Sequence, residues 1–87
     1  MLQVRGLTIS EDEAAELARR LRRYGDPVGV GVAERLERGL LAGTAIIGTS
    51  RPEAAVLLNV IEAWTPARLR EVATDLRRYL SSSDMAA

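Results

Sequence analysis

The sequence contains no cysteine, histidine, phenylalanine or lysine, and it has only three aromatic residues, Tyr24, Trp64 and Tyr79. Without Cys or His there is no disulfide framework, no thiolate or imidazole metal ligand, and no catalytic triad within the chain. No run approaches the ~18 apolar residues of a membrane span. The N-terminus lacks the basic and apolar segments of a secretion signal, so we expect a cytoplasmic protein. We also expect no metal and no cofactor.

The charge is balanced, because 12 Arg are matched by 12 acidic residues. A net charge of zero argues against a polybasic membrane anchor or a nucleic-acid coat, so we expect neither a membrane nor nucleic acid as the main partner. A chain of 87 residues forms one domain with a modest core, which oligomerisation often supplements. Arg without Lys, with abundant Ala, Gly, Leu and Val, is typical of a small protein from a GC-rich bacterial genome.

Two strands and four helices are predicted from periodicity and capping signals. Residues 2–9 and 44–49 have the composition and alternation of short strands. Ser10 and Glu13 have the spacing of a capping box ahead of a helical apolar stripe. The predicted helices cover residues 11–24, 30–41, 51–64 and, with Thr65 as N-cap, 66–80.

The two halves of the sequence resemble each other at a spacing of 40 residues. Ten of the 32 pairs from Ser10 to Leu41 are identical when each residue is compared with the one 40 positions later. This pattern predicts a helix-dominated α+β domain over residues 1–81, built from duplicated β-α-α units with internal pseudo-two-fold symmetry. The repeats are residues 2–42 and 43–81, their strands pair antiparallel near the axis, and residues 82–87 form a flexible tail. Chance similarity between amphipathic helices is the competing interpretation.

The halves differ on one face of the third helix. Glu16, Arg20 and Arg23 of the first half correspond to apolar residues in the second half. These apolar residues are Val56, Val60 and Ala63. A helix that is apolar on two sides is buried on two sides. Either these residues belong to the core of the monomer, or they bind another chain.

The predicted function is a non-catalytic protein–protein interaction module, either a homodimer or a small subunit of a larger assembly. The predicted partner-binding residues are Val56, Asn59, Val60 and Ala63. On this hypothesis Val60→Asp breaks the assembly and leaves a folded monomer, whereas loss of helical circular dichroism identifies these residues as core. An unpaired sheet edge offers a second route to assembly. No residue pattern indicates an enzyme.

Two alternatives stay open. The sequence Leu-Arg-Arg-Tyr occurs twice, at 21–24 and 76–79, and suits phosphate contact with base stacking by a nucleic-acid-binding regulator. The arginines concerned are Arg19, Arg20, Arg22, Arg23, Arg77 and Arg78. The same pattern is also explained without nucleic acid, because arginines near the C-terminal ends of two helices compensate the helix dipoles. Small-ligand binding between the two halves is the second alternative and rests on the symmetry alone.

Overall fold

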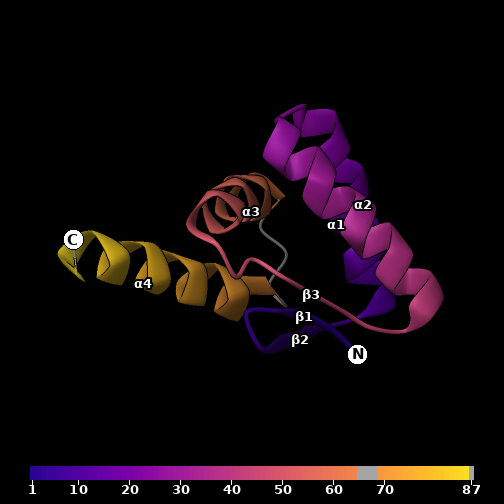
Figure 1. Cartoon of the computed structure of the whole chain (residues 1–87), viewed down its shortest axis with the longest axis horizontal. Coiled ribbons are helices and arrows are strands. Elements are labelled where there is room, and N and C mark those ends of the chain that lie inside the picture. The colour runs from indigo at the N-terminus through magenta and orange to yellow at the C-terminus, as the bar shows by residue number, and fades with distance from the viewer. Residues whose placement is uncertain (65–68, 87) are drawn as a thin grey trace.

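The computed structural model describes residues 1–64 and 69–86, with side-chain detail through residue 82. The chain begins with strands β1 (Leu2–Val4) and β2 (Leu7–Ile9), followed by helices α1 (Glu11–Tyr24) and α2 (Pro27–Ala42). Strand β3 (Ala45–Ile47) and helices α3 (Arg51–Trp64) and α4 (Arg70–Ala86) complete the order (Figure 1). The described part of the chain is dominated by helices beside a small sheet, which confirms the α+β class.

The sheet differs from the prediction, because it has three strands in the order β2-β1-β3. The expected single strand over residues 2–9 is wrong. Arg5 and Gly6 both have positive φ, 53° and 92°, and this pair of left-handed residues forms a two-residue turn that folds the segment into a hairpin. The expected antiparallel pairing between the two halves is also wrong, because β1 runs parallel to β3 with Val4 opposite Ile47.

Capping residues set where the first two helices begin. Glu13 N–H donates to Ser10 Oγ at 3.1 Å and Ser10 N–H donates to Glu13 Oε1 at 2.8 Å, which confirms the capping box. Helix α2 begins at Pro27, earlier than the expected residue 30, because Asp26 accepts a hydrogen bond from Val28 N–H at 2.8 Å and Pro27 fits the first helical turn.

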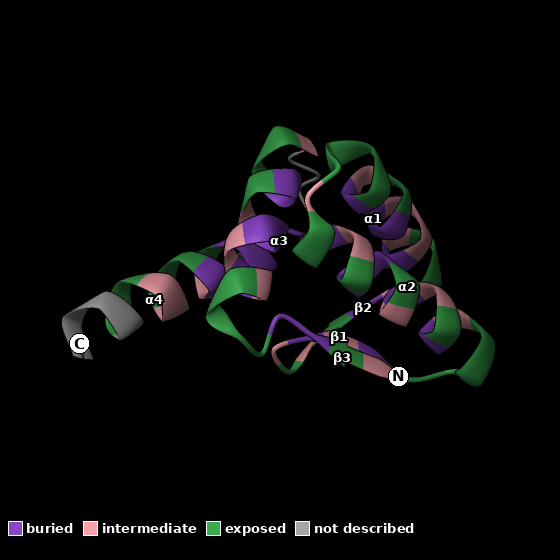
Figure 2. Cartoon of the chain, turned by 45° about the horizontal axis from the view of Figure 1, so that its top comes forward, coloured by how far each residue is buried: buried purple, intermediate pink, exposed green. Residues whose placement is uncertain are grey.

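The core lies between one face of the sheet and the helices (Figures 1 and 2). The sheet residues facing the core are Leu2, Val4, Ile9 and Ile47, all buried. Alternation along the strands places Gln3, Thr8 and Ile46 on the opposite face, where none of them is buried. The sheet therefore has one open face and two edges, β2 and β3.

Helix α4 extends beyond the other elements at one end of the molecule (Figure 1). The predicted start of this helix at Thr65 and residue 66 lies outside the described residues. The helix continues to Ala86, so the structure describes helical backbone over part of the predicted tail, residues 82–87. The flexibility of that tail stays a prediction.

Candidate functional site

Helix α3 is the central helix of the monomer, which corrects its expected role as an exposed apolar face. Val56 is only 7% exposed and Val60 only 4% exposed. Helix α2 packs directly on Val56, since a Cβ placed on Gly29 lies 3.0 Å from Val56 Cγ1. Both valines are therefore part of the core rather than of an exposed face of α3.

The other two predicted partner-binding residues, Asn59 and Ala63, are exposed. They lie on the C-terminal half of α3, which packs beside α1. Here a cleft of about 210 Å³ opens between the two helices. Its lining residues are Arg20, Arg23, Tyr24, Val60 and Ala63. The structure therefore combines residues from the predicted protein-binding set and the predicted nucleic-acid-binding set in one place.

Two aromatic side chains hold the walls of the cleft together. Tyr24, at the last position of α1, accepts a hydrogen bond from Asn59 Nδ2 at 3.4 Å and is 52% exposed. On the other helix, the Trp64 ring lies 4.8 Å from the Arg20 guanidinium carbon, a cation–π distance. The side chain of Val60, almost fully buried, forms the apolar floor between them.

The cations around the cleft are not equivalent. Arg20 Nε donates to Glu16 Oε2 at 2.8 Å, and Arg19 pairs with the other oxygen of the same carboxylate. Arg23 has no ion-pair partner among the side chains of residues 1–64 and 69–82. The cleft thus offers an apolar floor, a half-exposed tyrosine and one unpaired guanidinium.

The hydrogen bond from Arg19 lowers the pKa of the Glu16 carboxyl below its ordinary value of 4.5, and Arg20 adds to the shift. The hydrogen bond from Arg22 lowers the pKa of Glu37 in the same way. A carboxyl whose pKa falls on folding stabilises the folded protein at pH values above 4.5, and this stabilisation is lost as the pH falls through the lowered pKa.

We therefore expect the melting temperature to fall in acid, and Glu16→Gln and Glu37→Gln to weaken this dependence. Thermal melts from pH 7 down to about pH 2, which bracket the ordinary range of carboxyl pKa values, measure the effect. NMR titration of the two carboxyl groups is the direct check. Titration of either group at or above its value in the unfolded chain would contradict the ion-pair geometry.

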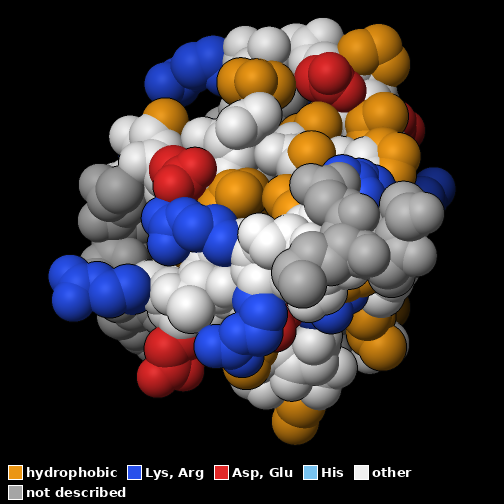
Figure 3. Space-filling model, turned by 90° about the vertical axis from the view of Figure 1, so that its left-hand side faces the viewer, with side chains coloured by type: hydrophobic (Ala, Val, Ile, Leu, Met, Phe, Trp, Pro, Cys, Tyr) orange, Lys and Arg blue, Asp and Glu red, His pale blue; other side chains and the backbone are white. Residues whose placement is uncertain are grey.

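Most arginines of the predicted nucleic-acid set are already paired. Arg22 binds Glu37 through two nitrogens at 2.8 and 2.6 Å, and Arg77 binds Glu62 at 3.1 and 2.7 Å. The two Leu-Arg-Arg-Tyr segments also line different hollows, because Arg23 belongs to the α1–α3 cleft and Arg78 to a groove beside β2. On the face shown in Figure 3, Arg and acidic side chains are interspersed with apolar ones rather than gathered by sign.

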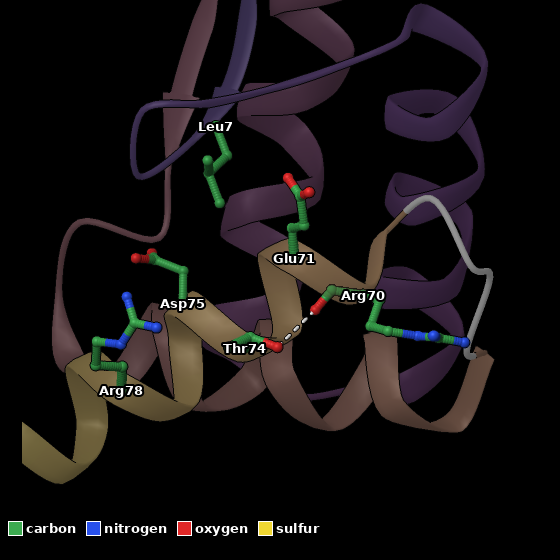
Figure 4. Close-up of a pocket in the computed structure, with 6 residues that line it drawn as sticks. All are labelled: Leu7, Arg70, Glu71, Thr74, Asp75 and Arg78. Atoms are coloured by element: carbon green, nitrogen blue, oxygen red, sulfur yellow. Dashed lines mark hydrogen bonds between the residues drawn. The ribbon is translucent and has the colours of Figure 1, made fainter.

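The groove beside β2 is the second hollow of note, with a volume of about 350 Å³ between Leu7 and the first turns of α4 (Figure 4). Its charged residues balance, with two cations and two acids. They are Arg70, Glu71, Asp75 and Arg78. The Asp75 carboxylate is bound by Arg5 Nε at 3.0 Å, and the Arg5 guanidinium lies 3.7 Å from the centre of the Tyr79 ring. These contacts fasten the β1–β2 turn to α4, which gives the groove a structural role.

Sequence reasoning missed the part played by Tyr24 and Trp64. Neither is among the residues predicted to bind a partner. The available signal was their place in the sequence, because they end two 14-residue helices that begin 40 positions apart.

Among the described residues, no group of three or more acidic side chains is arranged to hold a metal ion. No described helix combines the length and apolar character needed to cross a bilayer. Comparison with protein-family models, curated proteins and solved structures finds no match for the chain.

Proposed function

We propose that the protein is a non-catalytic protein–protein interaction module that binds its partner at the α1–α3 cleft. The observation that carries the proposal is the unpaired Arg23 beside the half-exposed ring of Tyr24, above the apolar floor formed by Val60. Arg and Tyr are the residue types most often found at the energetic centre of protein interfaces. The matching partner is a protein segment that places a carboxylate next to an apolar side chain.

The size of the cleft supports a protein partner over a small ligand. Its volume, about 210 Å³, lies below the ~300–1,000 Å³ typical of small-molecule pockets. It suits a single anchoring side chain from a larger partner surface. The pairing of Arg20 with Glu16 and of Arg22 with Glu37 leaves little unpaired positive charge for a nucleic-acid backbone.

The proposal includes the 40-residue duplication, which three observations support. Helices α1 and α3 have the same length of 14 residues and begin 40 positions apart. Arg22 pairs with Glu37, and the equivalent positions, Glu62 and Arg77, pair with the charges exchanged. The cleft is also lined by equivalent residues, Arg20 with Val60 and Arg23 with Ala63. Such pairs meet where a pseudo-two-fold axis passes between two helices.

The test is a selection from a random peptide library displayed on phage, with the wild-type protein as bait. We expect the selected peptides to share an acidic residue next to an apolar one. Arg23→Glu should weaken their binding at least about tenfold, because it places a like charge against the peptide carboxylate. Tyr24→Ala should weaken it as well.

Arg78→Glu is the matched control, because Arg78 holds the same place in the second Leu-Arg-Arg-Tyr segment and lines a different groove. It should bind the selected peptides like wild type. Peptides that bind Arg23→Glu undiminished would refute the cleft as the site. A fluorescent single-stranded oligonucleotide is the second probe, and salt-sensitive binding that both Arg variants weaken would favour the nucleic-acid alternative.

A further inference from the structure

The two edges of the sheet differ in what they expose, and the β3 edge is the apolar one. In the parallel pairing of β1 with β3, Ala45 N–H donates to Met1 C=O at 3.2 Å and Arg5 N–H donates to Ile47 C=O at 3.0 Å. Residues 45 and 47 therefore direct their backbone groups toward β1. Ile46 directs its N–H and C=O the other way, toward the open edge.

An exposed apolar side chain lies on this edge. Ile46 is 55% exposed. Between α2 and β3 lies a groove of about 240 Å³. Its lining residues are Arg35, Arg38, Gly39, Ala42, Thr44, Ala45 and Ile46. The exposed Ile46 side chain gains free energy when another surface covers it.

Strand β3 is short, with three residues, but it lacks the charged residues and the proline that prevent many edge strands from pairing. Its sequence, Ala-Ile-Ile, has no charge and no proline, and its register with β1 is continuous. The other edge strand is different. In β2 the residue whose backbone N–H and C=O point to the open edge is Thr8, and its hydroxyl contacts Met1 Sδ at 3.6 Å. The two edges therefore offer the same backbone pattern, but the residue at this position is polar in β2 and apolar in β3.

We propose that β3 is a self-pairing edge, and that two copies of the chain form a two-fold dimer through antiparallel β3 strands centred on Ile46. The arrangement is self-complementary, because each Ile46 N–H meets the C=O of Ile46 in the partner, and the two side chains lie together on the same face. The product is a continuous sheet of six strands, with β2-β1-β3 from each chain.

The two charged residues that line the groove beside β3 are both arginines of α2, Arg35 and Arg38. Arg35 is paired with Glu53, so within the described residues only Arg38 brings an unpaired charge to this side of β3. Only two backbone hydrogen bonds form at the axis, so we expect a dimer that dissociates on the order of micromolar concentrations.

Sedimentation velocity over a dilution series tests the dimer. We expect wild type to shift from the monomer to the dimer mass as concentration rises, and Ile46→Asp to require at least tenfold more protein, because two carboxylates meet at the axis. Thr8→Asp is the matched control on the opposite edge and should behave like wild type. Circular dichroism should show all three folded, since both substituted side chains are exposed.

A second measurement uses the absence of cysteine from the chain. In antiparallel pairing centred on Ile46, the two Cα atoms lie about 5.5 Å apart, within the range of a disulfide. Under mild oxidation Ile46→Cys should form a covalent dimer much faster than Thr8→Cys. A wild type that stays monomeric throughout the series, or equal oxidation rates for the two variants, would overturn the proposal. Neither measurement depends on the α1–α3 cleft, and Arg23→Glu should dimerise like wild type.

Discussion

Val60→Asp is expected to unfold the protein rather than to release a folded monomer. The Val60 side chain is 4% exposed and packs in the core of the chain itself. An aspartate there must be buried as an ion or protonated at a cost, and such substitutions destabilise by more than ~4 kcal/mol. A domain of this length has a total stability of only about 4–13 kcal/mol. Far-UV circular dichroism and thermal melts measure the loss.

Asn59→Asp is the control, because it adds the same carboxylate one position earlier on the exposed side of α3. This variant should keep the wild-type spectrum and nearly the wild-type melting temperature. The contrast between these adjacent positions separates the buried side of α3 from its exposed side. A Val60→Asp variant with an undiminished helical signal would mean that Val60 is not part of the core, and would restore Val56 and Val60 as an exposed apolar face.

The helices could be predicted from the sequence, because capping residues and apolar periodicity depend on residues that are close together in the chain. The first helix follows from the capping box at Ser10 and from its end at Gly25, where φ is 83°. The sheet could not be predicted in the same way. Its hairpin depends on Arg5 in a left-handed conformation, and the contacts that hold Arg5 come from Asp75 and Tyr79, about 70 residues away in the sequence. Arg-Gly is also not the usual sequence of such a turn.

The residues of the cleft were predicted in part and for separate reasons. Val60 and Ala63 were identified because they replace charged residues of the first half, and Arg20 and Arg23 because they are cationic. The pattern could show that α3 is apolar on two sides, but whether the second side meets solvent or α2 depends on packing between helices. The close approach of Gly29 to Val56 shows that the second side meets α2. The spacing of apolar residues within α3 carries no information about this contact, because Gly29 belongs to another helix.

Two of the three glycines of α2, Gly31 and Gly39, are expected to respond to alanine in opposite directions. A Cβ on Gly31 has nothing within 4 Å, so Gly31→Ala should stabilise the protein by about 0.5–1 kcal/mol through helix propensity. A Cβ on Gly39 overlaps the Cβ of Ala45 and lies 3.0 Å from the backbone oxygen of Thr44. Gly39→Ala should therefore destabilise by about 1–3 kcal/mol, as overpacked cores do.

Thermal melts of the two variants measure this difference, which should amount to at least about 5 °C in melting temperature for a domain of this length. Of the three atoms that face Gly39, only Leu2 Cδ2, at 3.2 Å, is the end of a flexible side chain, so α2 and β3 must separate to admit the methyl group. Adding Ala45→Gly to Gly39→Ala removes the closest of these contacts and should recover part of the loss. Equal stabilisation by both alanines would mean that α2 does not lie against the start of β3.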